Sequence, residues 1–291
     1  MQSIDVPREL SDKVLVNGGG HLPPLVIPHT WGSGVALDGV LASSLGDRAV
    51  VSLLPPDPAV EDMPRRTESW VARFSAILDA LGIHEIGALL GHSYAGVVAL
   101  ELARDRQMAG SPVGYVGLID SARPRLMPLS HGEATWLFLR DVSTRQDAAA
   151  RHAHLRWHTQ PFLKQRLHAV RTQATAWAQR RGLFNGTSAS GNDTVAEDPL
   201  KLSVWVSYLD YRGTAVNFPV SLFTTAHSVK RFKDPTLGWS GWLHGGPDVF
   251  AIPGPHYTLF DEEHADCLTS ILAASLQISS LRSSAARHRH E

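Results

Sequence analysis

Short apolar runs alternate along the chain with longer segments in which apolar residues recur at helical spacing. The short runs predict buried strands and the longer segments predict helices. The expected strands are residues 24–29, 49–56, 85–90, 114–120, 218–226 and 248–254. The expected helices include residues 34–46, 66–82, 97–105 and 262–278. This order predicts βαβ units and a mostly parallel central sheet with helices on both faces, which is an α/β fold.

The remaining segments suggest how the domain is organised. Glycine and proline in DKVLVNGGGHLPP, at residues 12–24, predict a loop or linker. From about 125 to 215 the pattern is almost wholly helical, and a helical block between two β-rich halves predicts a lid inserted after the strand that ends at Asp120. We expect one domain with a core at about 14–124 and 216–278, and a disordered, serine-rich tail at about 279–291. A separate helical domain is the less favoured alternative, because both flanks are needed to complete the sheet.

The composition excludes several classes of function. The 291 residues include 27 basic and 28 acidic side chains, so no strong charge field suggests nucleic acid or an anionic membrane surface as a partner. The single cysteine, Cys267, excludes an internal disulfide and a cysteine-based zinc site. No secretory leader opens the chain and no run reaches about 18 apolar residues, so a cytoplasmic protein is expected. The function is therefore expected to lie in a specific site.

The segment GHSYAG, at residues 91–96, places a serine between an expected strand and an expected helix. A G-x-S-x-G pattern alone is weak, because glycine and serine are common, and here Ala95 occupies the fifth position with Gly96 after it. The strand-to-helix context is what favours a nucleophile elbow, a tight turn that exposes a reactive serine. Ser93 is the candidate nucleophile.

A serine nucleophile needs a histidine base, and the chain has 15 histidines, so position must select among them. On sheets of this kind the histidine follows the last strand, in the chain order serine, acid, histidine. His256 comes two residues after the end of the expected strand 248–254. The other histidines of this region are expected to be structural or at the surface: His227, His244 and His264.

The candidate acid is Asp120, which ends the strand expected beside the serine strand. Carboxyl ends of parallel strands are where α/β sheets place functional groups. The competing location, the loop after residues 218–226, offers no carboxylate before Asp234.

Two backbone N–H groups must also stabilise the oxyanion that forms when the serine attacks a carbonyl group. We expect them from Tyr94 and from the segment after residues 24–29, where Thr30 is the first candidate and Trp31 the second.

Four segments in this order resemble the thioesterase domains that terminate nonribosomal peptide and polyketide synthases, within the α/β-hydrolase superfamily. They are LVNGGGHLPPLVIPHTWGSG, GHSYAG, LIDSARP and GPHYTLFDEEHA. The resemblance covers nearly the whole chain and implies an α/β-hydrolase fold. The sequence departs from the family pattern at Ala95, at Pro255, which stands where an acidic or amide residue often precedes the histidine, and at Thr30-Trp31. These departures bear on substrate size more than on activity.

The resemblance implies a reaction as well as a fold. Ser93, deprotonated by His256, would attack a thioester carried on the phosphopantetheine arm of an acyl or peptidyl carrier protein, expected upstream in the same synthase. Water would then release a free acid, or an internal amine or hydroxyl would release a cyclic product. No metal and no cofactor of the chain's own is expected. Aromatic residues of the oxyanion loop and the lid are expected to contact the acyl group: Trp31, Trp136, Trp205 and Tyr208.

Three alternatives remain open from the sequence. A free-standing editing thioesterase, of type II, would use the same three residues, and so would a carboxylesterase. A non-catalytic hydrolase relative that only binds an acyl ligand or a carrier protein would be expected to have lost at least one of them. Ser93, Asp120 and His256 are all present, which disfavours this last alternative.

Overall fold

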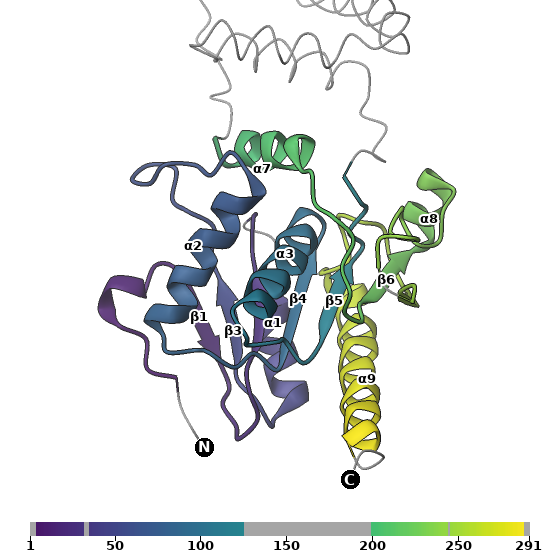
Figure 1. Cartoon of the computed structure of the whole chain (residues 1–291), viewed down its shortest axis with the longest axis horizontal. Helices are drawn as coiled ribbons and strands as arrows, with labels where there is room; N and C mark the ends of the chain where they lie inside the picture. The colour runs from purple at the N-terminus through teal and green to yellow at the C-terminus, as the bar shows by residue number, and fades with distance from the viewer. Residues whose placement is uncertain (1–3, 32–34, 125–198, 244, 288–291) are drawn as a thin grey trace, which may run out of the picture. The chain divides into compact units, whose positions relative to one another are not determined.

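The computed structural model describes residues 4–31, 35–124, 199–243 and 245–287, whose strands form a seven-stranded sheet (Figure 1). The strand order is β1-β3-β2-β4-β5-β6-β7, with β1 antiparallel to β3 and all other neighbours parallel. The strands are β1 Val14–Asn17, β2 Leu25–Pro28, β3 Val50–Leu53, β4 Ala88–His92, β5 Val116–Ile119, β6 Ser221–Thr225 and β7 Asp248–Ile252. The predicted parallel sheet is confirmed.

Helices cover both faces of this sheet. The described helices are η1 Arg8–Leu10, α1 Val35–Leu45, α2 Thr67–Ala80, α3 Tyr94–Met108, α7 Pro199–Asp210, α8 Ala226–Phe232 and α9 Glu262–Arg287. Alternation along β4 assigns the faces: Leu89 packs in the cluster that contains α2 and α3, whereas Ala88 and Leu90 pack in the cluster that contains α1 and α9. The carboxyl ends of the parallel strands thus meet at one edge of the sheet, whose inner strands β2 to β6 are buried.

Strand β1 corrects the prediction for residues 12–24, which were expected to form a loop or linker. Val14–Asn17 pairs antiparallel with β3, with Val14 opposite Leu53 and Asn17 opposite Val50. One of the glycines that suggested a linker is required for packing instead. A Cβ atom on Gly20 would lie 1.9 Å from the backbone oxygen of Asp47. The strand is short and pairs with a segment more than thirty residues away. The glycines beside it therefore determined the prediction from sequence more than its own apolar residues did.

Two helices bear on the predicted lid and tail. Helix α7 lies inside the segment 125–215 that was expected to be helical, and the part of that segment before Pro199 lies outside the described residues. Helix α9, the long yellow helix in Figure 1, was expected to end near Ile278 but continues to Arg287, so residues 279–287 are helical where a disordered tail was expected. None of the helices that the structure describes is long and apolar enough to cross a membrane.

Candidate active site

Ser93 lies in the tight turn that joins β4 to α3. Its backbone has φ 56° and ψ −126°, a conformation that residues other than glycine rarely adopt. The Ser93 N–H donates a hydrogen bond to the Ile119 carbonyl of β5, at 2.9 Å. The turn therefore holds the serine at the carboxyl edge of the sheet, in a strained backbone conformation of the kind found at functional sites.

Two glycines make this turn possible, and neither is at the position that departs from the motif. A Cβ atom on Gly91 would lie 2.3 Å from the Ala95 carbonyl oxygen, and one on Gly96 would lie 2.6 Å from the Ser121 Oγ. Ala95 itself is buried and accommodates its methyl group. The close approach of helix to strand thus requires glycine at positions 91 and 96. Position 95 does not have this requirement, so the turn tolerates alanine there.

Gly91→Ala is expected to lower the free energy of unfolding by about 1–3 kcal/mol or more, because the new methyl group meets backbone atoms that cannot move independently. Gly39→Ala, in the middle of α1, is the matched control, because the nearest atom to its Cβ would be 3.9 Å away. That control should be neutral or stabilising by up to about 1 kcal/mol. Chemical denaturation of both variants measures the difference. Equal stability of Gly91→Ala and the wild type would show that the turn is not as tight as described.

Asp120 follows β5, the neighbour of the serine strand, and is 2% exposed. Its Oδ1 accepts a hydrogen bond from the Thr225 N–H at 3.0 Å, and its Oδ2 accepts one from the Ser228 hydroxyl at 2.7 Å. Burial alone raises the pKa of a carboxyl, but hydrogen bonds from His256, Thr225 and Ser228 outweigh it and hold the pKa of Asp120 below its ordinary value. Asp120 is therefore an ionised carboxylate at neutral pH.

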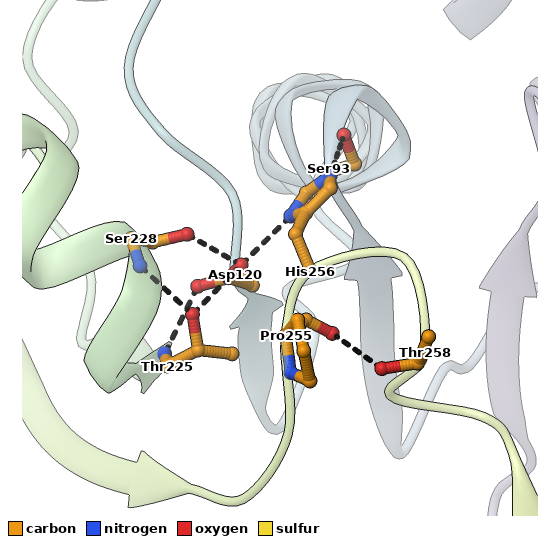
Figure 2. Close-up of polar contacts among 7 residues, drawn as sticks. All are labelled: Ser93, Asp120, Thr225, Ser228, Pro255, His256 and Thr258. Carbon is orange, nitrogen blue, oxygen red and sulfur yellow. Dashed lines mark hydrogen bonds and ion pairs between the residues drawn. The ribbon is translucent and has the colours of Figure 1, made fainter.

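His256 lies in the loop after β7, and local backbone chemistry shapes this loop. Gly254 has φ 82°, and a Cβ atom there would collide with the His264 ring. The Pro255 carbonyl accepts a hydrogen bond from the Thr258 N–H at 3.1 Å, which closes a turn around His256. Figure 2 shows Pro255 and Thr258 on either side of this turn. Pro255, a departure from the family pattern, serves here as a turn acceptor through its carbonyl.

The three candidate residues form one continuous chain of hydrogen bonds, with His256 between Ser93 and Asp120 (Figure 2). His256 Nδ1 lies 2.7 Å from Asp120 Oδ2, and His256 Nε2 lies 3.1 Å from Ser93 Oγ. Because an ionised carboxylate only accepts, Nδ1 carries the proton and donates it to Asp120, which leaves Nε2 to accept from the serine hydroxyl. This is the arrangement in which a histidine can take the proton of a serine.

The competing candidates lie elsewhere. Asp234 accepts hydrogen bonds from the Thr236 N–H and hydroxyl and from the Gly238 N–H, so its carboxylate closes a local turn. His227 is exposed on α8, and the His264 ring lies against Gly254. His244 lies outside the described residues.

The two predicted oxyanion amides are placed at the same edge of the sheet. Tyr94 is the first residue of α3, so its N–H is one of the N-terminal amides without an intrahelical acceptor. Thr30 is buried two residues beyond the end of β2, and no carbonyl in the described part of the chain accepts a hydrogen bond from its N–H. Both positions suit an oxyanion hole, and their role in one stays a prediction.

His92 contacts the site in a way that the sequence did not predict. Its ring packs on His256 with centroids 4.7 Å apart and meets Phe260 edge-on. Burial, and then the nearby His256, lower the pKa of His92 to about 3, so it is neutral at pH 7. No described residue accepts or donates a hydrogen bond at its Nε2. His92 is thus an uncharged ring that packs against His256, the candidate base.

The predicted substrate contacts have different environments. Trp31 is 40% exposed, with the Lys201 ammonium 5.9 Å from its ring centroid. Tyr208 is buried; its hydroxyl donates to the Ala122 carbonyl at 3.0 Å and its ring packs against Tyr94. These contacts pack Tyr208 against Tyr94 and the segment after β5, and its contact with substrate stays a prediction. Trp205 is half-buried beside Tyr208 on α7, and Trp136 lies outside the described residues.

The described residues contain no group of three or more histidine, cysteine, aspartate or glutamate side chains that could hold a metal ion. The expectation that the chain works without metal or cofactor of its own stays a prediction. Every group in the hydrogen-bonded chain is a protein side chain.

The parallel sheet, the serine turn and the hydrogen-bonded serine, histidine and aspartate define a protein of the α/β-hydrolase fold. The chain belongs to the thioesterase domain family, whose model matches residues 23–276. Among curated proteins, it is 29% identical over 213 residues to the atromentin synthetase of Tapinella panuoides, covering 65% of this chain and 20% of that protein. It is 26% identical over 226 residues to the inactive atromentin synthetase invA4 of Paxillus involutus, covering 72% of this chain and 22% of that protein. The chain thus spans about a fifth of the length of these relatives.

Solved structures share the fold. The NocB thioesterase domain, in a covalent complex with a fluorophosphonate nocardicin G analogue, superposes with a TM-score of 0.58 at 21% identity, over 91% of this chain and 99% of that one. A holo four-domain nonribosomal peptide synthetase bound to AMP and glycine gives 0.59 at 17% identity, over 90% of this chain and 20% of that one. The type II thioesterase BorB, from the borrelidin biosynthetic cluster, gives 0.55 at 18% identity, over 91% of this chain and 96% of that one.

Proposed function

We propose that this chain is a serine thioesterase that releases an acyl or peptidyl group from a carrier protein through an acyl-enzyme on Ser93. The observation that carries the proposal is the hydrogen-bonded chain from Ser93 through His256 to Asp120. Membership of the thioesterase domain family supports a thioester as the substrate.

In the first half of the reaction, His256 Nε2 takes the proton of Ser93 as the Oγ attacks the thioester carbonyl carbon. Asp120 stabilises the imidazolium that forms, and the N–H groups of Thr30 and Tyr94 stabilise the oxyanion. When the tetrahedral intermediate collapses, the carbon–sulfur bond breaks and the thiolate takes the proton from His256. The products are an ester on Ser93 and the free thiol of the carrier arm.

In the second half, His256 activates the nucleophile that frees the acyl group. Water gives a free acid, whereas an amine or hydroxyl of the acyl chain itself gives a cyclic product. Either nucleophile passes its proton to His256, which returns it to Ser93. The phosphopantetheine arm belongs to the carrier protein, so the chain supplies no cofactor.

The comparisons support a carrier protein as the partner. The relatives named above are synthetases about five times as long as the matched region, and a four-domain nonribosomal peptide synthetase contains a segment of the same fold. We therefore propose that the partner is an acyl or peptidyl carrier protein, upstream in the same synthase.

A direct comparison of substrates tests this function. We expect kcat/KM for an octanoyl thioester on a holo carrier protein to exceed that for p-nitrophenyl octanoate on the order of 100-fold, because binding energy from the carrier arm is available only to the first substrate. Octanoyl-pantetheine without the protein separates recognition of the thioester from recognition of the carrier. Faster hydrolysis of the simple ester than of both thioesters would instead make the chain a carboxylesterase.

A further inference from the structure

A second cluster of buried polar side chains lies outside the proposed triad. His29 Nε2 lies 2.6 Å from Asp38 Oδ2, and the Ser52 hydroxyl donates to the same oxygen at 2.5 Å. The three residues are 7%, 3% and 0% exposed, respectively. The proposed mechanism gives none of them a chemical step, so their presence needs another explanation.

The cluster joins three elements at the segment that carries a proposed oxyanion amide. His29 directly follows β2 and precedes Thr30, Asp38 lies in the first turn of α1, and Ser52 lies in β3. The His29 backbone N–H also donates to the Leu53 carbonyl at 2.8 Å. His29 is therefore held twice, through its ring and through its backbone.

This double attachment has a geometric consequence for Thr30. The Thr30 nitrogen is bonded to the carbonyl carbon of His29, and the peptide unit between them is planar. Once the position of His29 is fixed, the direction of the Thr30 N–H depends on one soft backbone angle. A loose His29 would let that N–H turn away from the oxyanion position, where even a small displacement weakens the hydrogen bond.

The energetics also favour a role in placement over a role in stability. Burying a carboxylate and an imidazole costs free energy that their mutual attraction only partly offsets, and apolar residues of similar volume are often as stabilising. What the polar cluster provides is direction, because hydrogen bonds define angles as well as distances. A carboxylate that accepts from both His29 and Ser52 fixes the end of β2 against α1 and β3.

We propose that His29, Asp38 and Ser52 are positioning residues that hold the Thr30 N–H in place for the oxyanion of the proposed thioesterase reaction. This inference rests on the proposed function. It assigns a purpose to a buried histidine and aspartate that do not touch the reacting atoms, and it predicts that their loss affects the rate of acylation more than substrate binding.

The test compares His29→Leu with His29→Gln, whose side-chain amide can donate to Asp38 from about the position of Nε2. Octanoyl-N-acetylcysteamine thioester is the substrate, and the rate of labelling by a fluorophosphonate is measured in parallel. We expect His29→Leu to lower kcat about 100-fold with KM changed less than about 3-fold, and to slow labelling similarly. His29→Gln should recover kcat at least about 10-fold over His29→Leu, because it restores the hydrogen bond.

Tyr115→Phe is the matched control, because it removes a buried hydrogen bond, from Tyr115 to Ser275 at 2.9 Å, at the start of β5 and away from the carboxyl edge. It should lower the melting temperature without lowering kcat. The proposal is overturned if His29→Leu, measured well below its melting temperature, keeps kcat within about 3-fold of the wild type, or if His29→Gln is as slow as His29→Leu.

If His29→Leu does not fold, Asp38→Asn takes its place, since it keeps the shape of the side chain and removes its charge. The proposal is then overturned if Asp38→Asn keeps kcat within about 3-fold of the wild type. Failure of the proposed function is distinguishable. A wild-type chain that turns over no thioester but is labelled by the fluorophosphonate contradicts the thioesterase function, whereas the effect of His29→Leu on the labelling rate still tests the positioning role.

Discussion

Replacing Ser93 with alanine is expected to lower kcat for a thioester on the order of 10⁵-fold or more and to abolish labelling by a fluorophosphonate. The hydroxyl is the only group in the hydrogen-bonded chain that can form the ester, and alanine leaves His256 without a proton to take. Labelling is measured by intact mass and turnover by release of free thiol.

Ser121→Ala is the matched control for this experiment. Ser121 is also buried at the site, next to Asp120, but no described residue forms a hydrogen bond with its Oγ. We expect this variant to be labelled and to turn over within about 3-fold of the wild type, as for a substitution outside the reacting groups. Labelling that persists in Ser93→Ala would move the nucleophile to another residue.

Asp120→Asn is expected to lower kcat by about 10⁴-fold while leaving the fold intact. The amide has no charge to stabilise the imidazolium on His256, and it can donate to Nδ1, which favours the tautomer that cannot accept from Ser93. Circular dichroism and a melting curve establish that the variant is folded, and steady-state kinetics with an octanoyl thioester give kcat.

Asp234→Asn is the corresponding control, because Asp234 is the next carboxylate along the chain after β6 and its side chain, among the described residues, binds only local turn groups. It should change kcat by less than about 3-fold. A large loss in Asp234→Asn together with a small loss in Asp120→Asn would place the acid in the later loop.

The sequence predicted the proposed triad because each of its members lies at or shortly after the end of a strand. Ser93 follows β4, Asp120 follows β5, and His256 comes shortly after β7, so three local patterns and their order were sufficient. Parallel strands place their carboxyl ends at the same edge of the sheet, whatever the length or conformation of the loops between them. The contacts between these residues then follow from the sheet order β4-β5-β6-β7.

The features that the sequence did not predict depend on contacts between distant segments. Strand β1 exists because β3 pairs with it, and its own residues are followed by three glycines. The hydroxyl of Tyr208 donates to the Ala122 carbonyl, 86 residues away, a contact that no local pattern predicts. The cluster of His29, Asp38 and Ser52 joins three elements, and no spacing along the chain distinguishes it.

The most direct test of the account is to find where the acyl group is attached during turnover. The wild-type chain is mixed with saturating octanoyl-N-acetylcysteamine thioester, quenched with acid in the first turnovers, digested and analysed by mass spectrometry. The account predicts an octanoyl group on the peptide that contains Ser93, and none on that peptide in Ser93→Ala. Release of thiol with the octanoyl group on any other residue would contradict it.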